Sequence, residues 1–142
     1  MKITKEEYLE ELGNIQTDWD MDWREKQEKI DALWEAYCDG LEVGDRAHVT
    51  LYSDVEPCTV IRRTAKTITV RYDDGKLDPN WKPEFIPGGF AAHCTNQEEQ
   101  VWNLFEDPNG QVETFHRRKA GWYNKSDCRL TPGWRKFYDY NF

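Results

Sequence analysis

Paired cysteines, long apolar runs and secretion signals are all missing from this sequence. Its four cysteines stand singly at Cys38, Cys58, Cys94 and Cys128, so the Cys-x-x-Cys motif of a zinc ribbon or a thioredoxin is excluded. No apolar run approaches the roughly 20 residues that cross a bilayer, and the N-terminal MKITKEEYLEE lacks the apolar region of a signal peptide. We therefore expect a cytoplasmic protein with free thiols and no membrane contact.

The motifs of common enzyme classes are missing as well. The chain has no glycine-rich phosphate loop, no Gly-x-Ser-x-Gly, no His-Glu-x-x-His and no carboxylate-rich calcium loop. A dyad of Cys94 and His116 is conceivable because a nearby imidazole lowers the pKa of a thiol, but four cysteines and three histidines make such a pair easy to find by chance. No spacing favours a metal site of Cys58, His93, Cys94 and Cys128. We predict no enzyme activity, no cofactor and no metal.

Charge is plentiful but unevenly distributed. The chain has 27 acidic and 19 basic residues, a net charge of −8. Residues 1–45 have a balance of −9 and residues 46–110 one of −3, whereas residues 111–142 have one of +4. The two ends are therefore opposite in sign. The acidic end either binds a basic partner or neutralises the basic end within the fold.

The acidic N-terminal segment predicts two helices. A capping box begins the first, which is expected over 5–12 and to end at Gly13. The second is expected over 22–38, where Trp23 and later apolar residues recur at helical spacing. Residues 14–22 are expected to connect the two helices.

The other face of the second predicted helix is charged. Its charges pair at intervals of three and four, so the simplest interpretation is a solvated face. The alternative is an acidic surface that contacts a basic protein or imitates a phosphate backbone. The candidates for a protein contact are Glu25, Glu28, Asp31 and Glu35.

Residues 41–74 hold the pattern around which the rest of the chain is organised. Apolar and polar residues alternate over 47–51, 58–63 and 67–72, and turn-forming residues separate these runs. Residues 73–76 (DDGK) are expected to close the third strand with a hairpin-type turn. Three short antiparallel strands predict a small SH3-like β-barrel or a strongly curled antiparallel sheet.

A long irregular loop is expected over 77–90. This segment contains three prolines and a Gly-Gly pair, which disfavour regular structure. We expect Trp81, Phe85 and Phe90 to fix the loop to the core. Long ordered loops often bind ligands, and covering an open end of the barrel is an equally good interpretation.

More strands are expected after the loop. Residues 100–106 and 111–118 predict a hairpin around an Asp-Pro-Asn-Gly turn, and another strand begins at Trp122. The predicted fold is thus α+β and rich in β-structure. An acidic helical segment (1–40) precedes a barrel or curled-sheet domain (41–142), and we expect the two to fold as one unit.

Cations and aromatic rings interleave in the basic C-terminal segment. Nucleotides and nucleic acids need both, since cations neutralise phosphate and ring faces stack on bases. The plainer interpretation is that the rings are core and the cations are the outward positions of the strands. The candidates for nucleotide contacts are Arg62, Arg63, Arg71, Arg117, Arg118, Trp122, Tyr123, Arg135, Lys136 and Tyr138.

Four segments of the chain resemble a family of small uncharacterised proteins from tailed bacteriophages. They are VGDRAHVTLYSDVEPCTVI, LDPNWKPEFIPGGFAAHCTN, EDPNGQ and WRKFYDYNF. The resemblance covers about residues 42–142 and leaves out the acidic helical segment. It implies an accessory protein made in the cytoplasm of an infected bacterium, and it assigns no functional residues.

By analogy, such phage proteins often counter host defence. We therefore expect a non-enzymatic protein that binds either a host defence protein, through its acidic helices, or a nucleotide signal. The nucleotide pocket would be basic and aromatic and formed or completed by a homo-oligomer. The alternative is binding of single-stranded DNA or RNA by the barrel, which the negative net charge disfavours.

Overall fold

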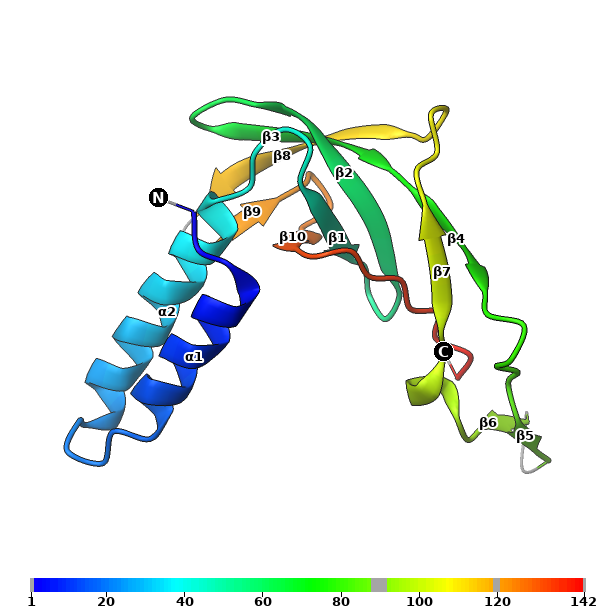
Figure 1. Ribbon diagram of the computed structural model, residues 1–142, viewed down its shortest axis with the longest axis horizontal. Coiled ribbons are helices and arrows are strands. Elements are labelled where there is room, and N and C mark those ends of the chain that lie inside the picture. Colours follow the sequence, from blue (N-terminus) through cyan, green and yellow to red (C-terminus); the bar gives the residue numbers. More distant parts are fainter. Residues whose placement is uncertain (1, 88–91, 119–120, 142) are drawn as a thin grey trace.

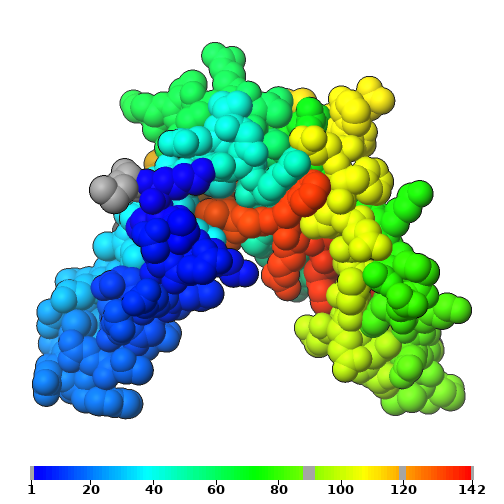
Figure 2. Space-filling model, in the orientation of Figure 1, coloured from blue at the N-terminus to red at the C-terminus, as the bar shows by residue number. Residues whose placement is uncertain are grey.

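The computed structural model shows the chain folded as an arch, and it describes residues 2–87, 92–118 and 121–141 (Figure 1). A barrel forms the top, two helices form one leg, and two small sheets form the other. The C-terminal segment runs beneath the barrel between the legs (Figures 1 and 2). In chain order the elements are α1 (Lys5–Gln16), α2 (Trp23–Asp39), β1 (Arg46–Thr50), β2 (Val55–Arg63), β3 (Thr67–Tyr72), β4 (Asp74–Leu77), β5 (Phe85–Ile86), β6 (His93–Cys94), the 3-10 helix η1 (Gln97–Glu99), β7 (Trp102–Phe105), β8 (Val112–Arg118), β9 (Gly121–Tyr123) and β10 (Arg129–Pro132).

The first helix starts where expected but runs past its predicted end. The hydroxyl of Thr4 accepts a hydrogen bond from the amide of Glu7 at 3.1 Å, which confirms the cap. The helix does not stop at Gly13, because Ile15 in its last turn is buried and only 7% exposed. The amide and hydroxyl of Thr17 both donate to the carbonyl of Gly13, at 3.0 and 2.8 Å. Packing and capping thus outweigh the glycine's cost of about 1 kcal/mol.

The second helix lies within one residue of its predicted bounds at both ends. Asp22 caps it by accepting from the amide of Glu25 at 2.9 Å. Its apolar side packs on α1, where the rings of Tyr8 and Tyr37 stack with centroids 4.6 Å apart. Trp23 was expected on that apolar side, but it is 75% exposed. It stands at the free end of the two-helix hairpin, where no further described element packs against it.

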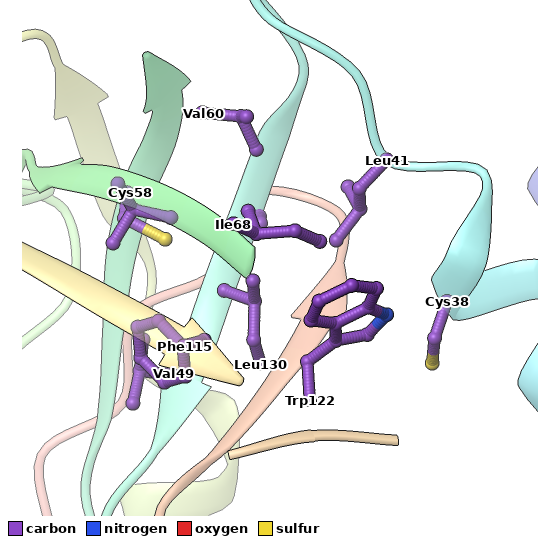
Figure 3. Packing of buried hydrophobic residues seen from close by; sticks show 11 residues of the cluster. Cys38, Leu41, Val49, Cys58, Val60, Ile68, Phe115, Trp122 and Leu130 are labelled. Atoms are coloured by element: carbon purple, nitrogen blue, oxygen red, sulfur yellow. The ribbon is translucent and has the colours of Figure 1, made fainter. Parts of the chain in front are cut away.

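Within the described residues, six antiparallel strands close into a barrel in the order β1-β10-β9-β8-β3-β2. This confirms the predicted β-rich α+β fold with a small barrel, in its closed form. Cys38 and Leu41 approach the rings and branched side chains of the barrel interior from the side of α2, so that helix closes one end of the barrel (Figure 3). The buried core consists of Cys38, Leu41, Ala47, Val49, Cys58, Val60, Ile68, Val70, Phe115, Trp122 and Leu130.

The hairpin turn predicted over 73–76 is wrong. The chain instead leaves the barrel after β3 and continues as β4, which pairs with β7 in a two-stranded ribbon. A Cβ on Gly75 would lie 2.8 Å from Cδ2 of Leu104, so this glycine serves a close approach between strands. The preceding Asp73 is buried, and its carboxylate accepts from the Thr59 hydroxyl at 2.5 Å. Burial of this carboxylate fixes the point where the chain departs.

The hairpin predicted over 100–118 is also wrong, although its turn exists. The amide of Gly110 donates to the carbonyl of Asp107 at 3.0 Å. The flanking strands do not pair with each other, because β7 pairs with β4 and β8 pairs with β3. Pairing with β3 places Phe115 in the barrel core, fully buried. The burial available in the barrel therefore decides the partner of β8.

The loop aromatics lie in the second leg and away from the barrel core. The ring centroids of Trp81 and Phe85 are 5.9 and 6.1 Å from that of Tyr140, and Phe85 is 49% exposed. The expectation that these rings reach the core is wrong, because the ribbon carries the loop away from the barrel. Phe90 lies outside the described residues. In the described part of the chain, no helix has both the length and the apolarity needed to span a membrane.

We expect one of the four thiols to react rapidly in the folded protein. Cys38, Cys58 and Cys94 are buried, and Cys128 is partly exposed. Burial raises the pKa of Cys38 to about 12 and also raises that of Cys58, so neither forms the reactive thiolate near pH 8.

An aromatic disulfide reagent at pH 8 measures this directly. The native protein should release about one equivalent quickly, and Cys128→Ser should remove that fast phase. All four thiols should react once the protein is unfolded. Fast release from the native Cys128→Ser variant would contradict the observed burial.

Candidate binding surfaces

The ten residues predicted to contact a nucleotide do not gather on one surface. Some meet where α2 joins the barrel, some form ion pairs on other parts of the barrel and the ribbon, and some are exposed singly. Arg63, Arg117 and Trp122 lie at the helix junction; Arg71 and Lys136 lie toward the ribbon; Arg118 and Tyr123 lie in β8 and β9; Arg62, Arg135 and Tyr138 are exposed.

Asp39, the last residue of α2, binds three of these candidates. Its carboxylate pairs with Arg117 through Nε at 2.9 Å and Nη2 at 3.2 Å, and it accepts from the Trp122 indole at 2.9 Å. Its backbone carbonyl accepts from Arg63 at 3.1 Å. The guanidinium carbons of Arg63 and Arg117 also lie 4.5 and 6.0 Å from the Trp122 ring centroid. These residues therefore dock the helix on the barrel.

Internal neutralisation is thus the observed use of much of the basic segment. Glu35, a candidate for protein contact, also approaches Arg117 at 3.5 Å. Three more candidate cations pair with carboxylates in other parts of the molecule. These pairs are Arg71–Glu106 at 3.2 Å, Lys136–Glu56 at 2.8 Å, and Arg118–Asp127.

Asp73 ties the second leg to the barrel as Asp39 ties the first. Besides Thr59, it accepts from the indole of Trp134 in the C-terminal segment at 3.0 Å. Arg46 and Arg71 each place a guanidinium nitrogen 3.9 Å from this carboxylate. The sequence assigned Asp73 to a turn and placed Asp39 one residue beyond the second predicted helix. An Asp-Gly or Asp-Asp-Gly run gives no signal that separates a buried carboxylate from a turn residue.

Three of the four residues predicted to contact a protein remain exposed on α2. They are Glu25, Glu28 and Asp31. The ion pair of Glu25 and the hydrogen bond of Asp31 both go to residues one turn away in the same helix. Such pairs are worth only a few tenths of a kcal/mol, so a partner can replace them easily.

The free end of the helical hairpin carries a surface that sequence reasoning did not find. Trp19 is 87% exposed and Trp23 is 75% exposed. Asp18, Asp20 and Asp22 lie among them, and one cation lies over each indole at 5.2 and 5.6 Å. We call these five residues the hairpin tip. An indole inside a polar connector was the one signal in the sequence that pointed here.

The cysteine and the histidine considered for catalysis lie far apart along the fold. Cys94 lies in β6 of the second leg and His116 in β8 of the barrel, so the conceivable dyad is split between two parts of the molecule (Figure 1). Across the residues that the structure describes, no three His, Cys, Asp or Glu side chains are grouped to hold a metal ion.

Comparison of the chain with protein-family models, with curated proteins and with solved structures found no match. The resemblance to phage proteins stays a prediction. Function is therefore inferred from the surfaces themselves.

Removal of the Asp39 carboxylate should loosen the helical leg. We expect Asp39→Ala to lower the free energy of unfolding by about 1–2 kcal/mol, because it breaks charge-assisted bonds to Arg117 and Trp122. Denaturant titration measures the change, and hydrogen exchange should show faster opening of α1 and α2.

Asp31→Ala is the matched control, since Asp31 is an exposed aspartate of the same helix. It should change the free energy of unfolding by less than about 0.5 kcal/mol. Equal effects of the two substitutions would contradict the role given to Asp39.

Proposed function

We propose that this protein is a non-enzymatic phage accessory protein that counters host defence by binding a host defence protein. The helical hairpin is the contact. The observation that carries the proposal is the hairpin tip, where two indoles 87% and 75% exposed stand among three aspartates. The tip is at the end of a leg that projects from the barrel (Figure 1). The phage context comes from the resemblance of residues 42–142.

Two exposed indoles are unusual outside binding surfaces. Some interface residues weaken binding by about 2 kcal/mol or more when they are replaced by alanine, and tryptophan is among the commonest of them. One tryptophan ring can bury roughly 150–250 Å² of surface. Within the part of the chain that the structure describes, a cation lies over one face of each ring of the hairpin tip, and the rings stay 87% and 75% exposed. A partner with an apolar recess would bury the two rings, and this burial would supply much of the binding free energy.

The acidic residues around the rings define the partner further. Residues 1–45 have a charge balance of −9, and the exposed carboxylates of α2 continue from the tip along the leg. Such a field attracts a basic surface and speeds association at low salt. We therefore infer a partner whose basic surface surrounds an apolar recess for an indole.

The nucleotide pocket expected from the sequence has less support. Arg63, Arg117 and Trp122, the most concentrated of its candidates, are occupied in docking α2. Binding of single-stranded nucleic acid by the barrel is disfavoured in the same way, since cations of β3 and β8 are paired with carboxylates.

Truncation of the tip tests the proposal. We expect the full chain to retain one host protein on affinity purification and to restore phage growth on a host that carries that defence. The variant Trp19→Ala/Trp23→Ala should weaken the complex at least about 30-fold, the equivalent of about 2 kcal/mol. Its melting temperature should stay near that of the parent, because both rings are exposed.

Charge-reversal variants distinguish an effect of the acidic helical leg from an effect of the overall negative charge of the chain. Glu25→Lys/Glu28→Lys should slow association, whereas Glu98→Lys/Glu99→Lys, which reverses exposed acids of η1 in the other leg, should not. A partner that the tip variant retains as well as the parent does would refute the role of the tip.

A further inference from the structure

A second surface lies on the concave side of the arch, on the outer face of β1, β9 and β10. The register places Thr50 opposite Arg129 and Arg129 opposite Tyr123 in one row across the strands. His48 and Thr131 are opposite each other in the next row on the same face. Because side chains alternate along a strand, these five residues point away from the core, toward the space between the legs.

Two adjoining hollows of about 250 and 460 Å³ lie over this face. His48 and Thr131 line both of them, so they form one depression. Tyr8 of α1 and Trp34 of α2 form its wall on the helical side, and Figure 2 shows the notch between the two legs. Sites for small ligands span roughly 300–1,000 Å³, a range that includes this depression.

Cations predominate in the depression although the whole chain has a net charge of −8. Lys5, Arg129 and Arg135 line it, with Asp127 as the only carboxylate among its described lining residues. Asp127 is paired with Arg118. In the described part of the chain, none of the three lining cations has a carboxylate within 4.0 Å. Their charge is therefore available to an anion.

His48 responds to this positive field. Burial lowers its pKa and the charges of Arg135 and Lys5 lower it further, against the opposing effect of a bond to the Gly133 carbonyl. Its Nδ1 lies 2.8 Å from that carbonyl oxygen, so Nδ1 carries the proton of the neutral ring. Nε2 then has no proton, and the lining cations are the groups that attract an anion.

Arg129 is fixed among aromatic rings. The hydroxyl of Tyr123 accepts from its Nε at 3.1 Å and from one terminal nitrogen at 2.6 Å. Its guanidinium carbon lies 5.4 Å from the ring centroid of Tyr123 and 5.8 Å from that of Trp34. The side chain is thus held in place while its charge is not neutralised, which is the condition for binding an anion without much loss of side-chain entropy.

We propose that this depression, which we call the concave site, binds a nucleotide. Arg129, Arg135 and Lys5 hold its phosphate, and the aromatic rings of the wall pack against its base. Cations together with ring faces are the two features that nucleotides require. An extended nucleic acid fits less well, because the helical leg beside the site carries the acidic charge of residues 1–45. The inference stands apart from the proposed host partner, which uses the other end of that leg.

The structure offers other hollows with less suited linings. The one of about 390 Å³ lined by Tyr72, Asn124 and Cys128 contains two carboxylates, Glu56 and Glu113. It has no lysine or arginine among its described lining residues. The hollow beside Lys2 and Arg46 also contains cations, but these two pair with Asp45 and Glu106. The unpaired cations therefore favour the concave site.

Thermal shift and calorimetry with the full chain test the proposal. The probes are adenosine and guanosine monophosphates, a cyclic dinucleotide, adenosine and inorganic phosphate. At a hundredfold excess over its dissociation constant, at least one nucleotide should raise the melting temperature by about 5 °C or more. Adenosine has the base without the phosphate, and inorganic phosphate has no base. Each should therefore raise the melting temperature by less than the nucleotide does at the same concentration.

Variants locate the binding. Arg129→Gln and Arg135→Gln should each weaken the nucleotide about tenfold or more, and Arg62→Gln, an exposed arginine of β2 outside the site, should change it less than about twofold. Arg135 makes no hydrogen bond or ion pair with the described residues, so its variant tests the site even where Arg129→Gln disturbs Tyr123.

Three results would overturn the proposal. One is the absence of any nucleotide-induced shift up to about 1 mM, a weak limit for a specific site. The second is an equal loss in Arg62→Gln and Arg135→Gln. The third is tighter binding of a single-stranded oligonucleotide than of any nucleotide, with a steep dependence on salt, which would assign the surface to nucleic acid. None of these three results depends on the host partner, so failure of the proposed function would not change them.

Discussion

The bonds of the Asp39 carboxylate to Arg117 and Trp122 determine where both proposed surfaces lie. They fix the end of α2 over the end of the barrel that Trp122 fills, next to the buried Cys38 and Leu41. An acid at a helix C-terminus opposes the helix dipole, and the guanidinium of Arg117 offsets that cost. With α2 held there, the hairpin tip projects into solvent and the helical wall of the concave site stands beside β10.

An aspartate joins each leg to the barrel through polar contacts. Asp39 serves the helical leg, and the buried Asp73 gathers Thr59, Trp134 and two arginines at the other. Most of the apolar core lies within the barrel, and Cys38 and Leu41 are its members from the helical leg and the linker after it. We therefore expect the legs to open locally before the barrel does.

Local patterns in the sequence determined the elements. Alternation placed β1 and β3 to within one residue of their observed bounds, the capping box located the start of α1, and helical spacing placed α2 to within one residue. Because the acidic candidates Glu25, Glu28 and Asp31 belong to the outer face of an amphipathic helix, their exposure followed from periodicity. A period of two or of 3.6 residues is fixed by the backbone, so it can be recognised without the tertiary structure.

Only the tertiary structure decided how these elements are used. It paired β8 with β3 instead of β7, and it made Asp39 and Asp73 the junctions between the legs and the barrel. It used Arg117 to dock a helix 78 residues earlier in the chain, and it left Arg129 without a carboxylate partner among the described residues. Which cation meets which carboxylate depends on contacts between residues far apart in sequence, and no local period encodes those contacts.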